Sequence, residues 1–190
     1  MSQPTPSNPP SNPHSVPQAG APLEDAGSLI AQVNLLCDAL RQAREPVAAL
    51  DAIGAATLRT LGPGLLTINA WHAHVHRIER LWSSDPAAYP VGGHKTKGDS
   101  PWRRQLLERG EVFVGEGDDA LAAVFDDVQV IRKLGCTAVV NVPLGHQGAV
   151  IGTFNYLADR AIWPAAEVAA LRLLGALAVA PVQALTAART

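Results

Sequence analysis

Two β-branched runs joined by a short turn constrain the fold of this 190-residue chain more than any other feature. The runs are 136–144 and 149–157, and Gln147-Gly148 lies between them. Runs rich in Val, Ile and Thr on either side of a Gly-containing turn predict an antiparallel hairpin. Because Pro143 has no N–H to donate, we expect it at a bulge or with its nitrogen facing away from the partner strand.

Helical periodicity precedes and follows this hairpin. A first helix should begin near Ser28, with its buried stripe formed by Leu29, Ile30, Val33, Leu36, Cys37 and Leu40. Pro46 suits the first turn of a second helix, and Gly62-Pro63-Gly64 should stop it; its stripe is Val47, Leu50, Ile53, Thr57 and Leu61. A last helix should open at Pro164, and Pro181 should kink or end it.

The middle of the chain predicts strands, a long loop and short helices. Strands are expected at 65–71, 77–84 and 112–114, and a loop rich in turn residues at 85–98. Ser100-Pro101 should open a short helix, and further helical pieces lead to Gly135. No regular strand–helix–strand unit appears. The order therefore indicates an α+β fold, a central antiparallel sheet with helices packed mainly on one face.

Composition separates residues 1–24 from the remainder. Seven of the fifteen prolines lie there among Ser, Asn and Gln, and no charged residue precedes Glu24. Such a segment buries too little apolar surface to offset its ordering entropy. We therefore expect a disordered Pro-rich tail at 1–24 and a single domain at 25–190.

Charge and hydropathy narrow the partners and the compartment. The net charge of −2 argues against a nucleic-acid or anionic membrane surface as partner. The most apolar stretch, 168–182, contains Arg172 and is too short to span a bilayer. The chain shows no export signal, and Cys37 and Cys136 fit no disulfide or zinc pattern. We expect a cytoplasmic protein in which both cysteines are reduced and buried.

Three histidines are the candidate metal ligands. His72, His74 and His76 alternate, so on a regular strand they would share one face and could bind zinc, copper or iron. The segment 71–77 also has the character of a hairpin tip, where alternation fails. We favour the exposed tip and assign no metal site.

No catalytic constellation is visible. The serines at 83, 84 and 100 are not in a nucleophile elbow, and no His lies at a suggestive spacing from Cys136. The acidic residues at 116–127 match no calcium loop and fit helix capping. No glycine-rich phosphate-binding motif occurs. We assign no catalytic residue.

Aromatic and amide side chains are the candidate ligand contacts. Trp82, Tyr89 and Trp102 flank the long loop, which also carries Lys95. Asn141 and Asn155 lie inside otherwise apolar strands, where an unpaired amide loses about 1–3 kcal/mol. Each amide therefore either bonds neighbouring backbone or faces a pocket. The hairpin register decides between these two outcomes.

The hairpin resembles that of GAF domains. The family's strand ending in Val-Pro-Leu, Gly turn and Ile-Gly strand are similar to Val142-Pro-Leu144, Gly148 and Ile151-Gly152 here. The resemblance covers about 28–182, and 80–95 with Ser100-Pro-Trp102 is similar to small bacterial stand-alone GAF proteins. It implies a GAF-like, PAS-related sheet, a dimer surface on the helices and a ligand cavity under loops.

The resemblance leaves the ligand and cofactor open. GAF domains bind cyclic nucleotides, tetrapyrroles, haem or small metabolites, and the motifs that distinguish these classes are missing here. The leading hypothesis is a non-catalytic sensor of a small molecule, homodimeric through its first and last helices, that signals to a separate output protein. Its cavity would be lined by Trp82, Ser84, Tyr89, Lys95, Trp102, Asn141 and Asn155. The alternatives are a redox or metal-dependent enzyme related to GAF-type methionine sulfoxide reductases, and a pure dimerisation module with a filled core.

Overall fold

The computed structural model describes residues 26–188. The predicted tail at 1–24 lies outside the described residues, as do residue 25 and the last two positions. Six strands are present: β1 (Leu65–His72), β2 (Arg77–Ser83), β3 (His94–Thr96), β4 (Phe113–Glu116), β5 (Ala138–His146) and β6 (Ala149–Ala158). The helices are α1 (Ala26–Gln42), α2 (Pro46–Leu61), α3 (Pro101–Arg103), α4 (Gly117–Ala122), α5 (Val128–Lys133), α6 (Ala165–Leu177) and α7 (Val179–Ala187).

The strands form one antiparallel sheet in the order β3-β2-β1-β6-β5-β4. The predicted hairpin is β5–β6 in the middle of it, and its turn uses Gln147 at φ 49° and Gly148 at φ 78°. Pro143 lies where β4 no longer pairs with β5, next to an irregularity between Leu144 and Gly145. The α+β class and the antiparallel sheet predicted from the sequence are therefore confirmed.

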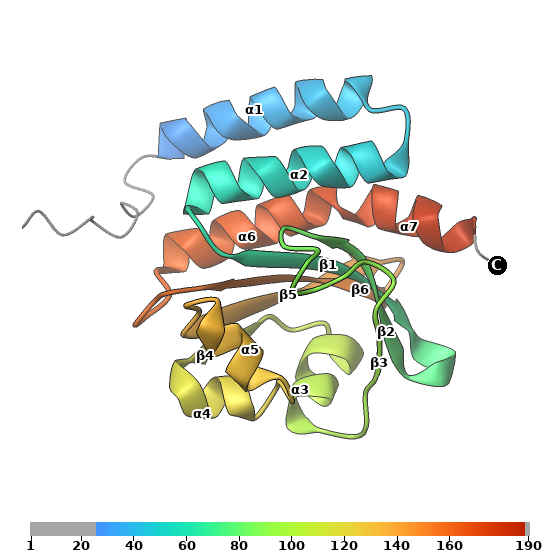
Figure 1. The fold of residues 1–190 in the computed structure, drawn as a ribbon. Coiled ribbons are helices and arrows are strands. Elements are labelled where there is room, and N and C mark those ends of the chain that lie inside the picture. Colours follow the sequence, from blue (N-terminus) through green and yellow to red (C-terminus); the bar gives the residue numbers. More distant parts are fainter. Residues whose placement is uncertain (1–25, 189–190) are drawn as a thin grey trace, which may run out of the picture.

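The long helices cover one face of the sheet (Figure 1). α2, α6 and α7 contact the strands, and α1 packs on the outer side of α2. Phe154 and Tyr156 of β6 are fully buried beneath them. The other face is covered by shorter elements: α3 with the π-helical turn η2 (Arg104–Glu108), α4, α5 and the β2–α3 connection.

The first helix differs in detail from its prediction. It begins at Ala26 rather than at a Ser28 cap, and its inward side is Leu29, Leu36 and Leu40. Ile30 is 61% exposed and Cys37 is exposed, so the predictions that these two are buried are wrong. Ile30, Leu35 and Cys37 flank the inward stripe and widen the apolar sector of α1, so periodicity alone did not identify the face that meets α2.

The last helix is longer than predicted. Residues 165–187 have the length and hydropathy of a membrane-spanning helix, so the expectation that this stretch is too short was wrong. Within the fold it is a core helix, with Leu171 and Leu174 buried on β5 and β6. It is interrupted at Ala178, because Pro181 supplies no N–H for the carbonyl of Leu177.

Candidate functional site

Polar side chains line the face of the sheet that the long helices leave open. Alternation along β1 sends Leu66 and Ile68 into the helical core and turns Thr67 and Asn69 to the opposite face. β5 and β6 place Asn141 and Asn155 directly opposite each other on the same face. The sequence left the register of this hairpin open, and the structure places both amides toward a pocket.

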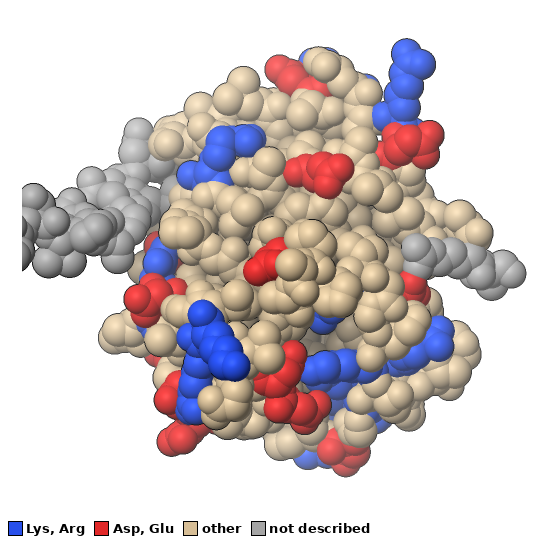
Figure 2. Space-filling model, in the orientation of Figure 1, with Lys and Arg blue, Asp and Glu red and all other residues tan. Residues whose placement is uncertain are grey.

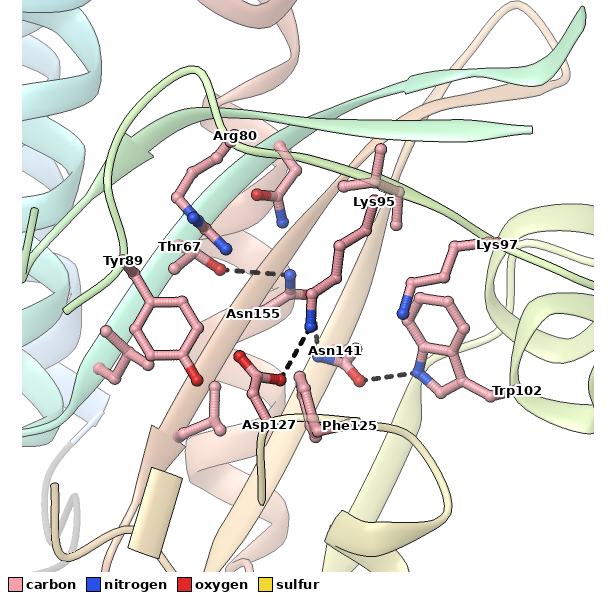
Figure 3. A pocket seen from close by; sticks show the side chains of 15 residues that line it. Thr67, Arg80, Tyr89, Lys95, Lys97, Trp102, Phe125, Asp127, Asn141 and Asn155 are labelled. Carbon is pink, nitrogen blue, oxygen red and sulfur yellow. Dashed lines mark hydrogen bonds and ion pairs between the residues drawn. The ribbon is translucent and has the colours of Figure 1, made fainter. Parts of the chain in front are cut away.

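These side chains form one hydrogen-bonded chain (Figure 3). Trp102 Nε1 donates to Asn141 Oδ1 at 2.9 Å, and Asn141 Nδ2 donates to Asn155 Oδ1 at 2.8 Å. Asn155 Nδ2 then donates to the hydroxyls of Thr67 and Thr153, at 3.3 and 3.1 Å. Because each amide is satisfied by side chains rather than by backbone, the chain forms a preorganised polar floor.

The roof of the pocket comes from segments distant in sequence. Tyr89 descends from the β2–β3 connection, Lys95 and Lys97 come from β3 and its end, and Phe125 and Asp127 come from the α4–α5 link. Lys95 Nζ donates to Asp127 Oδ1 at 2.8 Å, which closes the space between these two segments. The aromatic ring of Trp102 forms one wall, with Lys97 Nζ 4.9 Å from the ring centre.

Three cations and one carboxylate line this pocket. Burial lowers the pKa of Arg80, although the nearby Tyr89 and Asp127 oppose the shift. Burial also lowers the pKa of Lys97, and the neighbouring charge of Lys95 adds to the effect. Burial is the strongest single influence on the pKa of Asp127 and raises it, but the hydrogen bond and the charge of Lys95, together with smaller hydrogen-bond contributions, hold that pKa below its usual value. Positive charge is therefore in excess here.

Tyr89 brings a buried hydroxyl into the same space. The residue is 6% exposed, and its ring lies 4.8 Å from the guanidinium carbon of Arg80. Burial raises its pKa, and the adjacent Asp127 raises it further. Figure 3 shows the hydroxyl turned toward Asp127, yet it completes no hydrogen bond of normal geometry with any described residue.

The pocket is partly open to solvent, and its volume is small, about 60 Å³. Sites for drug-sized molecules are roughly 300–1,000 Å³, whereas a water molecule takes about 30 Å³ of liquid volume. In this conformation the pocket therefore holds a few waters or a very small solute. A larger ligand requires movement of the roof.

Five of the seven predicted contact residues lie together here: Tyr89, Lys95, Trp102, Asn141 and Asn155. Trp82 does not. Its Nε1 donates to Asp51 of α2 at 2.7 Å, and its ring covers Gly54, where a Cβ would lie 2.2 Å from the indole. The prediction that Trp82 lines the cavity is wrong, because it packs on the helical side of the sheet.

A β-bulge explains the position of Trp82. In the β1–β2 ladder Asn69 is opposite Arg80 and Ile68 is opposite Trp82, so Leu81 is an extra residue in β2. Strict alternation would put Arg80 and Trp82 on one face, but the extra residue separates them. Arg80 consequently faces the pocket, while Leu81 and Trp82 face the core.

Ser84 is also outside the pocket. Its Oγ accepts from the backbone N–H of Leu66 at 2.9 Å and donates to the carbonyl of Gly64 at 3.3 Å. Both partners lie at the start of β1, so Ser84 fixes the end of the β1–β2 pair. The prediction that it contacts a ligand is not supported by its position.

Five polar residues of the pocket were not predicted: Thr67, Asn69, Arg80, Lys97 and Asp127. Thr67 followed from strand alternation once β1 was assigned. Arg80 depended on the bulge, and Asp127 was interpreted as part of a solvated acidic cluster. Charged residues on short elements give no sequence signal for the face that they occupy.

The three histidines do not converge. β1 ends at His72, whose Nε2 lies 3.0 Å from Glu79 Oε2, and a 3₁₀ turn η1 (Ala73–Val75) follows. His76 has φ 48°, and its ring stacks on Trp71. Within residues 26–188 no three His, Cys, Asp or Glu side chains are grouped to hold a metal ion.

Cys136 lies within the connection between α5 and β5. The residue is 3% exposed, and burial raises the pKa of its thiol. A thiol held neutral is a poor nucleophile. Cys37 lies exposed on α1, so the described chain offers no pair of neighbouring cysteines.

Comparison with solved structures identifies the fold. The structure superimposes with a TM-score of 0.71 on the GAF domain of a phosphoenolpyruvate-protein phosphotransferase from Coxiella burnetii, at 14% identity, covering 87% of this chain and 98% of that one. The GAF domain of a two-component sensor histidine kinase from Bacillus halodurans gives 0.58 at 14% identity, with 74% and 98% covered.

The chromophore-binding domain of a bacteriophytochrome from R. palustris gives a TM-score of 0.62 at 11% identity, with 86% of this chain and 63% of that one covered. No protein-family model and no curated protein sequence matches the chain. At these identities the likeness establishes the fold, and the GAF-like fold predicted from the hairpin is confirmed.

Proposed function

We propose that this chain, whose fold is that of a GAF domain, is a non-catalytic sensor that binds a small molecule between the open face of its sheet and the β2–α3 connection. The observation that carries the proposal is the buried polar chain from Trp102 through Asn141 and Asn155 to Thr67. A purely structural core has no need of two amides at its centre, because apolar residues fill such positions at lower cost.

The similar structures support a sensory role. One belongs to a sensor histidine kinase, one to a methyl-accepting chemotaxis protein and one to the chromophore-binding part of a bacteriophytochrome. Carried over to this chain, they favour a domain that changes a signalling output when its pocket is filled. We also propose that the protein is cytoplasmic and passes its signal to a separate output protein.

The small volume fits a sensor with a closed unliganded state. The Lys95–Asp127 pair joins β3 to the α4–α5 link across the pocket, and these side chains are 37% and 28% exposed. Partly exposed ion pairs contribute about 0–1 kcal/mol, so a ligand can displace this one at little cost. Opening would move α4 and α5, which gives ligand binding a structural consequence.

Native mass spectrometry of gently purified full-length protein tests the proposal. We expect a retained small molecule, or stabilisation by a member of a broad metabolite panel. Ile78→Trp should abolish both, because Ile78 lines the pocket and the indole would fill about 60 Å³. Val75→Trp, at an exposed position of the same hairpin, is the matched control and should bind as the wild type does.

Binding that is unchanged in Ile78→Trp would place the ligand elsewhere and contradict the proposal. A wild-type protein that retains nothing and is stabilised by nothing would favour the dimerisation module with a closed core. Turnover lost in Cys136→Ser would instead favour the redox enzyme.

A further inference from the structure

The pocket contains more hydrogen-bond donors than acceptors. Arg80, Lys95 and Lys97 face one carboxylate, that of Asp127, and Lys95 already occupies it. The ammonium group of Lys97 lies over the face of Trp102, and the charges of Asp126 and Asp127 act on it from nearby. Cations held partly out of water against too few anions are stabilised by any anion that enters.

Two of these donors are buried without partners among the described residues. One is the hydroxyl of Tyr89, a residue that is 6% exposed and is turned toward Asp127 without completing a hydrogen bond of normal geometry, and the other is Nε of Arg80. The remainder of the Arg80 guanidinium is fixed, since Nη1 donates to the carbonyl of Pro90 at 3.0 Å. Buried donors in native structures nearly always find an acceptor, so a missing acceptor points to an absent ligand or water.

One anionic group, a carboxylate, is already bound to a cation in this pocket. Asp127 places a carboxylate against Lys95 Nζ at 2.8 Å, with the Tyr89 hydroxyl beside it. Leu65, Leu157 and Phe125 supply apolar wall next to these polar groups. An apolar wall suits the carbon part of an organic anion better than it suits a fully hydrated inorganic one.

We infer that the ligand is a small organic carboxylate whose carboxyl group binds between Arg80, Lys95 and the Tyr89 hydroxyl, with its carbon body against Leu65 and Phe125. The inference rests on the proposed function and specifies its ligand class. In the unliganded protein Asp127 acts as an internal competitor, and the incoming carboxylate takes over its bond from Lys95.

The indole N–H resonance of Trp102 is a direct reporter. It belongs to the polar floor through Asn141, whereas the indole of Trp82 bonds Asp51 on the other side of the sheet. The chain has four tryptophans, so Trp102→Phe assigns the signal. Full-length protein is titrated with propionate and benzoate, with propionamide and benzamide as uncharged counterparts, and with inorganic phosphate, at constant ionic strength in carboxylate-free buffer.

We expect one or both acids to shift the Trp102 resonance saturably, to leave Trp82 unmoved, and to bind at least tenfold more tightly than their amides. Arg80→Gln and Lys95→Gln should each weaken binding about tenfold, as expected for loss of a charge-assisted hydrogen bond. Asp127→Asn should tighten binding several-fold, because it removes the competitor. If Asp127 had only a structural role, Asp127→Asn would not increase the affinity for the acid.

Arg77→Gln and Lys133→Gln are the matched controls, at exposed positions outside the pocket, and should bind as the wild type does. If Arg80→Gln fails to fold, Lys95→Gln and Asp127→Asn still decide the matter. Amides that bind as tightly as acids would overturn the carboxylate assignment and leave the sensor proposal standing.

Three results would each overturn the inference. Phosphate could bind more tightly than both acids, or neither acid could shift the Trp102 resonance. Alternatively, Lys95→Gln and Asp127→Asn could leave the affinity for the acids unchanged. In those cases the native mass spectrometry still decides the proposed function separately.

Discussion

The role of a single polar residue in this protein depends on which residues it contacts. Asn141 and Asn155 look alike in sequence as amides within apolar strands, and direct opposition in the hairpin makes each the partner of the other. Arg80 and Trp82 look equally suited to a ligand site, and only one of them reaches it. Whether a buried polar residue stabilises the fold therefore depends on whether its neighbours complete its hydrogen bonds.

Asn141→Ala should destabilise the protein. Asn141 is fully buried, and its removal leaves Trp102 Nε1 and Asn155 Oδ1 without their partner. We expect a loss of about 1–3 kcal/mol in the free energy of unfolding, measured by urea denaturation. Asn34→Ala, at an exposed position of α1, is the control and should stay within about 0.5 kcal/mol. A loss no larger than the control's would show that the floor is not a connected network.

Alkaline titration should find both tyrosines resistant to ionisation. Burial raises the pKa of Tyr156 to about 12 and also raises that of Tyr89. Because the folded pKa values lie above the ordinary value of 10.0, this contribution to stability is complete below pH 10 and is lost as the pH rises toward the folded values.

Tyrosinate absorbance, compared in folded and urea-unfolded protein, checks this expectation. At about pH 11 the folded protein should show little tyrosinate and the unfolded one should show most of its two phenols ionised. Half-ionisation near pH 10 in the folded protein would contradict the burial of both rings.

At the scale of elements, local irregularities direct side chains as much as regular strands do. The extra residue Leu81 in β2 turns Arg80 toward the pocket and Trp82 toward α2. The three-residue strand β3 forms inside a stretch that has only turn character in the sequence, because His94–Thr96 pairs with the start of β2. Elements this short carry no periodicity of their own and depend on the partner strand.

The β5–β6 turn gives a clean test of backbone conformation. Gly148 has φ 78°, and a Cβ added there would meet nothing within 4 Å. Gly148→Ala should therefore cost about 1–2 kcal/mol from conformation alone, measured by thermal or urea unfolding. Gly145→Ala is the matched control in the same hairpin, with a φ outside the positive range and its nearest contact at 4.0 Å, and it should be nearly neutral. Equal effects at both positions would argue against this turn geometry.

At the scale of the whole molecule, the sheet separates the side of the long helices from the side of the pocket. Figure 2 shows charged side chains over the whole visible face, more closely spaced in the half that carries α3, α4 and α5 and more scattered around α1 and α2. Ile30 and Leu35 are each 61% exposed on α1, and Leu173 of α6 is 44% exposed. Other exposed apolar residues, such as Val91 and Ile162, lie outside these helices, but those on α1 and α6 could contribute to association with another chain.

Leu35→Glu should therefore weaken self-association. We expect the wild-type protein to sediment as a homodimer through α1 and the α6–α7 pair, and this variant to shift toward monomer with at least a tenfold higher dissociation constant. Leu134→Glu replaces a Leu that is 37% exposed on the opposite side and should leave the dimer intact. A wild-type protein that is monomeric at all concentrations in analytical ultracentrifugation would contradict the dimer.

Elements whose signals are local could be predicted from the sequence alone. Hairpin β5–β6 was predictable from β-branched runs and a Gly turn, α2 from Pro46 and Gly62, and the sheet class from the order of elements. Of the five predicted residues that line the pocket, four followed from the rarity of aromatics and amides in such settings, and Lys95 followed from its place on the long loop.

Features that depend on contacts between two segments distant in sequence could be assigned only from the tertiary structure. The buried face of α1, the bulge that divides Arg80 from Trp82, and the pairing of Lys95 with Asp127 all belong to this class. Each of these residues could lie on either face of its helix or strand at a similar local free-energy cost. The choice is made by packing and charge contacts between residues up to tens of positions apart in the chain.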